Sequence, residues 1–271
     1  MRNGLLVDDQ EDVVDLSEKA LDDLLRRAHR RLDPALRRIR RERVAIGITE
    51  TAIAPLLVAQ GARGLMAVRF LDIGDNAAFL ARLRERFELV PDAAIATVIG
   101  QEIALLLRGD ARAVDARAVD LRLVASEFQR RALKHLRKIP AGALTSYQAL
   151  AAAAGSPSAQ RAIGNTVASN PIAIYVPCHR VIKSDGAIGN YGGGVERKLA
   201  LLRAEGFQPD AASRIPAGTV YGHQVTRIFC RPTCSAAKRA RRDRMLIYPG
   251  AQGATTAGLR PCKLCHPDRG A

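Results

Sequence analysis

Five cysteines are the residues of this 271-residue chain best suited to chemistry. Four of them form two close pairs near the C-terminus, with 27 residues between the pairs: Cys230, Cys234, Cys262 and Cys265. Two close pairs across a loop suit a tetrahedral zinc site, which four thiolates satisfy. Two disulfides are the alternative interpretation, and a reducing compartment disfavours them. Because the count is odd, internal disulfides cannot pair every cysteine.

The fifth cysteine, Cys178, stands alone between Pro177 and His179. A thiol becomes a nucleophile when a base or a positive field shifts it toward the thiolate, and histidine is the usual base. Neighbouring side chains often point apart, however, and the apolar residues 174–176 also suit a buried structural cysteine. Cys178 is therefore a candidate nucleophile, with an inert thiol as the alternative.

The composition narrows the class of partner. Lys plus Arg number 42 and Asp plus Glu 27, and the net charge of +15 favours a polyanion, either nucleic acid or an acidic membrane surface. Aromatic residues make up 4% and Trp is absent, which disfavours an extended base-stacking platform. No apolar run approaches the roughly 20 residues that span a bilayer, and the acidic N-terminus lacks a secretory pattern. We expect a soluble, intracellular protein.

The elements that must position these cysteines begin after a basic extension, residues 1–43. Leucines at helical spacing predict a helix over 15–41, interrupted at Pro34. This segment is interpreted as a solvated amphipathic helix or, alternatively, as an arm that contacts DNA. From Val44 onward, short apolar runs predict an α+β layer, to which we assign a supporting role without catalytic residues. Its predicted strands are 44–48, 56–59 and 65–71, with a turn at Gln60 and Gly61, and its predicted helices are 76–87 and 92–107.

Residues 126–206 are predicted to be mainly helical. Helices over 146–154 and 158–169, joined by a turn at 155–157, fit a helix-turn-helix unit, although many structural helix pairs have the same pattern. The second helix carries one cation, Arg161, among small residues that permit close approach to a groove or to another helix. The polar segment 210–218 is predicted to be a linker.

Three motifs around the lone thiol carry a family resemblance. They are Pro177-Cys-His-Arg-Val181, Asn190-Tyr-Gly-Gly-Gly194 and Glu205-Gly206. Together they resemble the methylated-DNA–protein-cysteine methyltransferase family, which repairs O6-alkylguanine. Supporting matches fall at Phe128-Gln129, Pro140, Ser146-Tyr147, Arg161 and Ser169-Asn170-Pro171. The resemblance covers about residues 44–206 and implies a subdomain resembling ribonuclease H (44–124), followed by a helix-turn-helix active-site subdomain (125–209).

The resemblance implies direct displacement by Cys178, whose sulfur attacks the alkyl carbon on guanine O6. His179 would act as the base through a water molecule, and Glu205 would orient the imidazole. Asn170 would brace the active-site turn, and Tyr147 would donate a hydrogen bond to the departing purine. Because a thioether has no easy return path, each protein molecule would accept one alkyl group. O6-methylguanine is the expected lesion, with O4-methylthymine as a second.

The resemblance also implies how DNA is held. The O6 substituent is inaccessible inside a duplex, so the base must flip out, and Arg161 would replace it in the stack. The second helix would enter the minor groove. The backbone amide of Gly192, after Tyr191, would lie near O6, and the carbonyls of Cys178 and Val181 would receive the exocyclic amine. Gly192 stands where the family often has a polar residue, which predicts a changed tolerance for bulky alkyl groups.

The tail over 219–268 resembles the metal-binding module of the Ada DNA repair and regulatory family. The motifs are Ile228-Phe-Cys-Arg-Pro-Thr-Cys234 and Leu259-Arg-Pro-Cys-Lys-Leu-Cys-His-Pro-Asp268. This implies Zn²⁺ on the four cysteines, with Cys230 accepting a methyl group from a DNA phosphotriester. Methylating one thiolate would reduce the negative charge that repels phosphate. The candidate phosphate contacts are Arg227, Arg231, Lys238, Arg239, Arg241, Arg242 and Arg244. A zinc knob that only helps to hold DNA is the alternative.

Together these observations predict a cytoplasmic, bacterial-type, monomeric DNA repair methyltransferase with a zinc module at 219–271. Duplex DNA is the expected partner, which would associate the protein with the nucleoid. Neither an organic cofactor nor a membrane partner is expected. The alternatives are a non-catalytic DNA-damage-binding protein, an Ada-like regulatory protein and a sequence-specific transcription factor. The retained Cys178 disfavours the first, and the single cation on the second helix disfavours the last.

Overall fold

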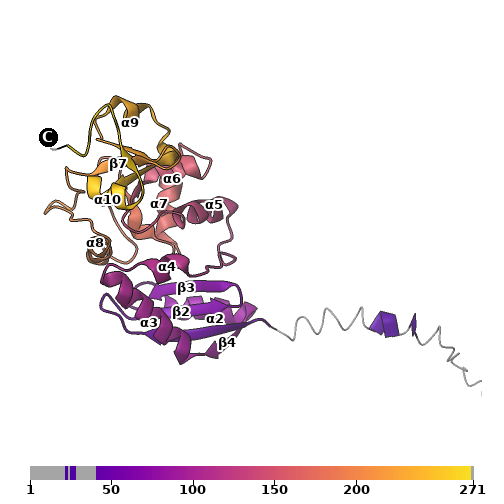
Figure 1. Ribbon diagram of the computed structural model, residues 1–271. Helices are drawn as coiled ribbons and strands as arrows, with labels where there is room; N and C mark the ends of the chain where they lie inside the picture. The colour runs from indigo at the N-terminus through magenta and orange to yellow at the C-terminus, as the bar shows by residue number, and fades with distance from the viewer. Residues whose placement is uncertain (1–21, 24, 29–40, 270–271) are drawn as a thin grey trace, which may run out of the picture. The chain divides into compact units, whose positions relative to one another are not determined.

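The computed structural model describes residues 22–23, 25–28 and 41–269 (Figure 1). Its contacts divide the chain once, into Met1–Glu42 and Arg43–Ala271. Residues 22–23 and 25–28 of the first unit are helical, and Arg26 and Arg27 each pair with an aspartate one turn earlier. The rest of the predicted basic extension, up to residue 40, lies outside the described residues. The other predicted domain boundaries fall inside the second unit and stay predictions.

The second unit begins with a four-stranded sheet in the order β3-β2-β1-β4. Its elements are β1 (Arg43–Thr49), β2 (Leu56–Gly61), β3 (Gly64–Phe70), α2 (Asn76–Arg86), β4 (Glu88–Pro91) and α3 (Ala93–Leu107). β1 pairs antiparallel with β2 and parallel with β4, and β2 pairs antiparallel with β3. The α+β arrangement is as expected, whereas the likeness to ribonuclease H stays a prediction.

The alternating side chains of β2 explain why helices cover both faces of this sheet. Leu56 and Val58 pack with α3, whereas Leu57 and Ala59 pack with α2. Burial on both faces produces the continuous apolar run that the sequence shows in this strand. Gly47 lets α3 approach β1 closely, because a Cβ there would lie 2.7 Å from the carbonyl oxygen of Asp92.

The predicted turn at Gln60 and Gly61 is wrong. Both residues still belong to β2 and pair with Leu65 and Gly64 across an irregularity in the register. The turn itself consists of residues 62–63. Gly64 follows it with φ of 129°, and a Cβ at this position would lie 2.5 Å from the carbonyl oxygen of Ala118. β2 and β3 therefore stay paired up to Gly64, because a glycine permits this close approach to the Ala118 carbonyl.

The next part of the chain is mostly helical. Its elements are α4 (Arg112–Ala116), α5 (Glu127–Leu136), β5 (Thr145–Ser146), α6 (Tyr147–Ala153), α7 (Gln160–Ala168), the 3₁₀ turn η1 (Cys178–Arg180), β6 (Val181–Ile182) and α8 (Val195–Ala204). The two helices expected around residues 155–157 are present as α6 and α7. The hydroxyl of Ser146 caps α6 by accepting a hydrogen bond from the Ala149 amide at 3.1 Å.

The C-terminal module, defined here as residues 219–269, contains a second four-stranded sheet in the order β10-β8-β7-β9. Its elements are β7 (Val220–His223), β8 (Ile228–Cys230), α9 (Ser235–Arg239), η2 (Arg242–Arg244), β9 (Met245–Tyr248), α10 (Ala251–Thr256) and β10 (Arg260–Pro261). Backbone hydrogen bonds of 2.8 and 2.9 Å join Leu144, just before β5, to Ile247 in β9. The module therefore continues the hydrogen bonding of the helical part (Figure 1).

The predicted linker at 210–218 packs against the loop that follows β6. The Ile188 amide donates to the Ser213 carbonyl at 2.9 Å, and the Ile215 amide donates to the Gly186 carbonyl at 3.0 Å. Ile215 also packs on a small apolar cluster that includes Phe207. The linker assignment stays a prediction, and these hydrogen bonds hold the segment to the loop after β6. None of the helices in the described part of the chain is long and apolar enough to cross a membrane.

Candidate active site and four-cysteine cluster

Cys178 lies on a tight turn between α7 and β6. Ile174 adopts φ of 72°, a left-handed conformation that is unfavourable for a β-branched residue. The Cys178 amide then donates to the Val176 carbonyl at 2.8 Å, and η1 starts directly after Pro177. Ile174 is fully buried, so the surrounding core holds this strained backbone in place. The turn leaves the Cys178 side chain 4% exposed.

Asn170 braces this turn from the end of α7. Its amide nitrogen donates to the Val176 carbonyl at 2.8 Å and lies 3.2 Å from the Cys178 sulfur. Its amide oxygen accepts from the Ile172 backbone at 3.1 Å. One side chain therefore fixes two points of the turn and provides a donor to the sulfur.

A second link runs from this turn to α3. The hydroxyl of Tyr175 donates to the Glu102 carboxylate at 2.8 Å, and Arg117 pairs with the same carboxylate. Tyr175 is fully buried, and burial beside Glu102 raises its pKa well above the usual range. The sequence analysis missed this link, because nothing in the pattern relates a tyrosine in the turn to a glutamate 73 residues earlier.

His179 and Glu205 form a buried pair behind the sulfur. The imidazole Nε2 lies 3.0 Å from Glu205 Oε1, whereas Nδ1 is buried without a hydrogen-bond partner among the described residues. Burial lowers the pKa of His179, although the Glu205 carboxylate opposes this shift. A neutral imidazole held by a carboxylate can accept a proton at its other nitrogen.

The Glu205 carboxylate also neutralises a fully buried arginine. Arg180 donates to it through Nε at 3.0 Å and through a terminal nitrogen at 2.7 Å, and it also donates to the Ile139 carbonyl at 2.6 Å. Burial alone would raise the pKa of Glu205, but His179 and Arg180 outweigh it and lower the pKa to about 2. Glu205 is therefore a carboxylate at neutral pH, able to orient the imidazole.

Lys198 is a buried cation that the sequence analysis did not single out. Its ammonium donates to the carbonyls of Val181 and Ile188 at 2.6 and 2.7 Å. Burial lowers its pKa to about 8, while the neighbouring Cys178 thiol acts in the opposite direction. Burial raises the pKa of Cys178, and Asn170, the nearby Tyr191 hydroxyl and Lys198 act against that increase. The Val181 carbonyl already serves Lys198, and its second lone pair stays available for another donor.

A cavity of about 200 Å³ opens at the sulfur. Its walls include Cys178, Asn170, Tyr191 and Gly192 from the helical part. Phe70, Ile73 and Gly74 also line the cavity, so the α+β layer, to which the sequence analysis assigns a supporting role without catalytic residues, supplies part of the cavity wall. These residues come from the end of β3 and the turn after it. Their contribution depends on the packing of distant segments, which no local motif records.

Gly193 allows the helical part and the end of β3 to meet beside the cavity. A Cβ at this position would lie 2.4 Å from the Phe70 ring and 2.5 Å from the Tyr191 ring. The two rings pack edge to face with centroids 6.3 Å apart. Arg197 lies over the Phe70 ring at 4.8 Å, and it also donates to the Ile53 carbonyl at 3.0 Å. The glycine-rich loop 190–194 and α8 therefore pack against the end of β3 beside the cavity.

Five of the predicted site residues lie outside the cavity lining: His179, Glu205, Val181, Tyr147 and Arg161. Tyr147 is half-buried at the start of α6, and burial together with the Cys178 thiol raises its pKa. Arg161 is exposed on α7, away from the sulfur. Tyr147 and Arg161 both lie on the helix pair that the sequence pattern indicated. The exposed Gly192 has little room for a side chain, because a Cβ would lie 3.2 Å from the Ala168 carbonyl oxygen.

The four C-terminal cysteines come together in the C-terminal module. Their sulfurs all lie within 4.8 Å of one another, and none of the five cysteines forms a disulfide. A tetrahedral zinc site with Zn–S bonds of about 2.3 Å has sulfur–sulfur edges of about 3.8 Å. The donor set, its spacing and its burial therefore fit a zinc ion. The structure does not contain the two disulfides that were the alternative interpretation.

Two family models match consecutive parts of the chain. Residues 127–207 match the model described as 6-O-methylguanine DNA methyltransferase, DNA binding domain, and residues 211–268 match the metal binding domain of Ada. These matches define the class: a protein-cysteine methyltransferase domain followed by an Ada-type metal-binding domain.

Individual proteins agree with both models. The bifunctional transcriptional activator/DNA repair enzyme Ada of Escherichia coli is 33% identical over 162 residues, which cover 60% of this chain and 45% of that protein. The methylated-DNA–protein-cysteine methyltransferase of Rattus norvegicus is 56% identical over 82 residues, 30% of this chain and 39% of that protein. The crystal structure of Mycobacterium tuberculosis O6-methylguanine methyltransferase is 34% identical, with a TM-score of 0.48, and the match covers 64% of this chain and 96% of that one.

The chain spans about half the length of the curated relatives it matches. The chain carries a domain of the methylated-DNA–protein-cysteine methyltransferase type at 127–207, followed by an Ada-type metal-binding domain at 211–268. Both resemblances drawn from the sequence motifs are thereby confirmed.

Proposed function

We propose that this protein repairs DNA by moving the methyl group of O6-methylguanine onto Cys178, in a methylated-DNA–protein-cysteine S-methyltransferase reaction. The observation that carries the proposal is the environment of one sulfur. Cys178 lies in the wall of a cavity, with the Asn170 amide 3.2 Å away and with His179 of the same turn held by the buried Glu205 carboxylate. Inert structural cysteines lack a base, a donor and an opening of this kind.

In the proposed reaction the sulfur forms a bond to the methyl carbon while the bond from that carbon to O6 breaks. The thiol proton passes to Nδ1 of His179 through a water molecule, and Glu205 stabilises the resulting imidazolium. The departing guanine receives a hydrogen bond from the Tyr147 hydroxyl, and the proton held by His179 returns through water to the guanine anion, so that the thiol proton ends on the base. Because the product is a stable thioether, each molecule reacts once. O4-methylthymine carries its methyl group on a similarly placed oxygen and is proposed as a second lesion.

The proposed substrate is duplex DNA with the damaged base turned out of the stack. A base inside the helix cannot place its O6 substituent against a sulfur that is 4% exposed. In this proposal α7 lies in the minor groove, where its small residues permit close approach and Arg161 fills the gap left by the base. The amide of Gly192 and the carbonyls of Cys178 and Val181 would then contact the edge of the flipped guanine, beside Tyr191.

A zinc ion in the C-terminal module is the proposed resident metal. Cys230, Cys234, Cys262 and Cys265 would hold it, and the metal would keep their sulfurs as thiolates. Cys230 is the candidate second acceptor, for a methyl group on a DNA phosphotriester. The Ada-type match over 211–268 and the gathered sulfurs support this second proposal.

The test of the main proposal is stoichiometric. Purified protein is mixed with an excess of duplex that carries one O6-methylguanine with a labelled methyl group, and protein-bound label is counted over time. We expect a plateau at one methyl per molecule for wild type and no transfer for Cys178→Ser. Binding of the damaged duplex without label transfer would favour the DNA-damage-binding alternative instead.

A further inference from the structure

A second hollow, distinct from the cavity at Cys178, lies where the C-terminal module packs on the helical part. We call it the junction cleft, and its volume is about 270 Å³. Its lining includes three cations, Lys183, Lys238 and Arg242, together with the hydroxyl residues Ser146 and Ser184. Lys183 follows β6, whereas Lys238 and Arg242 belong to α9 and η2, so both parts of the protein supply charge. Carboxylate side chains are absent from the described lining of this cleft.

The junction is closely packed, and a hydrogen bond across it holds one of the three cations, Arg242. Leu144 and Ile247 exchange two backbone hydrogen bonds across it. The Arg242 guanidinium donates to the side chain of Gln148 on α6. Apolar residues of the C-terminal module, such as Phe229, belong to the same core cluster as residues of the helical part. The C-terminal module is therefore packed against the first helix of the α6–α7 pair, rather than tethered beside it.

We propose that the junction cleft is a phosphate site, in which the C-terminal module and the helical part together bind a backbone phosphate of the damaged duplex. Three cations without a lining carboxylate form a positive hollow that selects an anion. Lysine, arginine and serine side chains are the usual partners of DNA phosphates. This inference rests on the proposed function, because it takes the duplex bound by α6 and α7 as the ligand.

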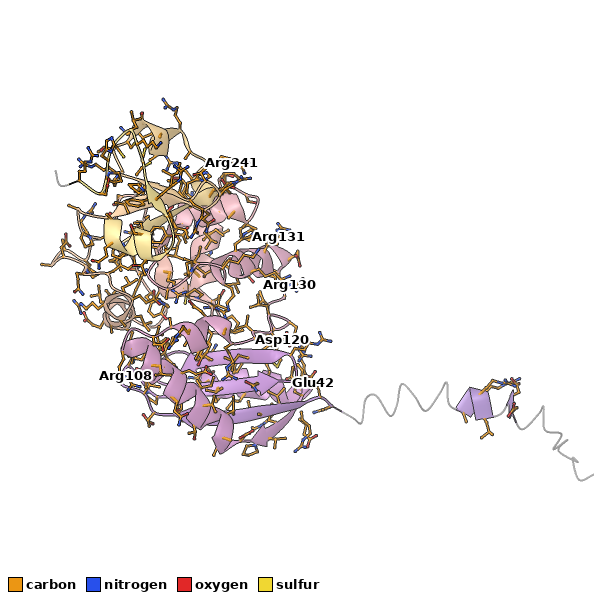
Figure 2. All side chains as sticks on the ribbon, viewed as in Figure 1. Glu42, Arg108, Asp120, Arg130, Arg131 and Arg241 are labelled. Atoms are coloured by element: carbon orange, nitrogen blue, oxygen red, sulfur yellow. The ribbon has the colours of Figure 1, made fainter. Side chains whose placement is uncertain are left out.

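The surroundings of the cleft favour a duplex over a small free anion. Ser146 lines the cleft, and the next residue, Tyr147, begins the helix that faces the Cys178 site. Beyond the cleft the same segment carries the exposed Arg244 and the exposed Arg241, of which Arg241 is paired with Asp243 at 2.8 Å. Figure 2 shows Arg241 of this segment and Arg131 of α5 toward the same edge of the view, with Arg108 at the opposite edge. A long polyanion can contact such a series of charges, whereas a single phosphate cannot.

The inference makes the C-terminal module part of the DNA interface for repair at Cys178, whatever Cys230 accepts. Each phosphate that lysine or arginine side chains neutralise releases condensed counterions. The logarithm of the binding constant therefore falls by roughly 0.9 for each neutralised phosphate when the salt concentration rises tenfold. Contacts from the cleft therefore contribute directly to the measured salt slope.

The experiment measures binding of wild-type protein to a duplex with one O6-methylguanine between about 0.05 and 0.3 M salt. It is repeated for the triple variant Lys183→Gln, Lys238→Gln, Arg242→Gln. We expect the slope of log binding constant against log salt to fall by about one unit, because one phosphate loses its cations, with affinity on the order of ten-fold weaker at 0.1 M salt. The variant Lys183→Arg, Lys238→Arg, Arg242→Lys keeps the charges and should keep the slope.

The matched control neutralises three exposed arginines elsewhere, through Arg63→Gln, Arg108→Gln and Arg203→Gln. It has the same net charge as the triple variant, so an equal loss of slope in both would overturn the inference. An unchanged slope in the triple variant would also overturn it, even if inorganic phosphate binds the cleft. Zinc content and thermal midpoint confirm that the variants are folded. If the wild-type protein binds the duplex with a steep salt dependence but transfers no methyl group, the proposed function is contradicted. The comparison of salt slopes between the variants still tests the phosphate site in that case.

Discussion

The lone cysteine and the four-cysteine cluster prepare sulfur for chemistry in different ways. Around Cys178, a single thiol is buried beside an amide donor, an imidazole–carboxylate pair and the Lys198 ammonium. In the cluster, four sulfurs lie within 4.8 Å of one another, where four thiolates would repel strongly without a cation. The first arrangement needs a base and an opening, and the second needs a metal. The difference indicates that the first site is built for one reaction and the second for a bound ion.

The two sites also differ in how the chain builds them. The Cys178 site draws on segments from Phe70 to Glu205, so its geometry depends on the packing of the whole second unit. The cluster comes from two short segments on β8 and just after β10, with their spacing written in the sequence. Substitutions far from the sulfur should therefore damage the first site more than the second.

The largest effect is expected from replacing one cysteine of each kind with serine. Cys178→Ser should lower the rate of methyl transfer from O6-methylguanine by at least about a thousand-fold and leave the zinc content unchanged. Cys234→Ser should lower the zinc content, because it removes one of four ligands, and should leave Cys178 as the acceptor. Single-turnover kinetics and metal analysis of both variants measure this. Loss of zinc in Cys178→Ser would contradict the conclusion that the lone cysteine and the four-cysteine cluster are separate sites.

The next effect concerns the buried carboxylate. Glu205→Gln leaves the buried Arg180 guanidinium with Asp115 as its remaining charged partner, and we expect the free energy of unfolding to fall by about 3 kcal/mol. Transfer to Cys178 should also slow, because the imidazole loses its orienting charge. Urea denaturation gives the stability. Glu88→Gln, which removes the exposed partner of Arg43, is the control and should change stability by less than about 1 kcal/mol.

The comparison of wild type with Glu205→Gln also predicts how the free energy of unfolding depends on pH. The pKa of Glu205 is lowered to about 2 in the folded state, below its ordinary value near 4.5. Its contribution to stability is therefore complete above about pH 4.5 and is lost as the pH falls toward 2. The difference in unfolding free energy between wild type and Glu205→Gln should narrow as the pH is lowered from 7 to 3.5. A difference that widens toward acid would contradict the assigned shift.

The smallest effect is expected where the turn meets α3. Tyr175→Phe removes the hydrogen bond to Glu102 but leaves the Arg117 pair with that carboxylate. Stability should fall by about 1 kcal/mol, and the rate of transfer should change by less than about twofold. Thermal denaturation and single-turnover kinetics measure the two quantities. A large loss of rate would show that this link positions the sulfur itself.

The motifs located the lone cysteine and the four-cysteine cluster, because Cys178–His179 and the paired cysteines are local patterns, whereas the chemistry assigned to them stays a prediction. The main strands and the α6–α7 pair were also predictable from apolar periodicity. The short strands β7 to β10 were not, since two to four residues carry too little pattern and depend on pairing with distant partners. Lys198 was missed because a lysine in sequence is expected to be exposed, and only long-range packing buries it.

The most direct test of the account is to find where the methyl group goes. Wild-type protein is reacted with a duplex whose only lesion is O6-methylguanine with a labelled methyl group, and its proteolytic fragments are then separated by mass spectrometry. We predict a methylated fragment that contains Cys178 and unmodified fragments that contain the four cluster cysteines. Label on Cys230 instead, or full transfer by Cys178→Ser, would contradict the account.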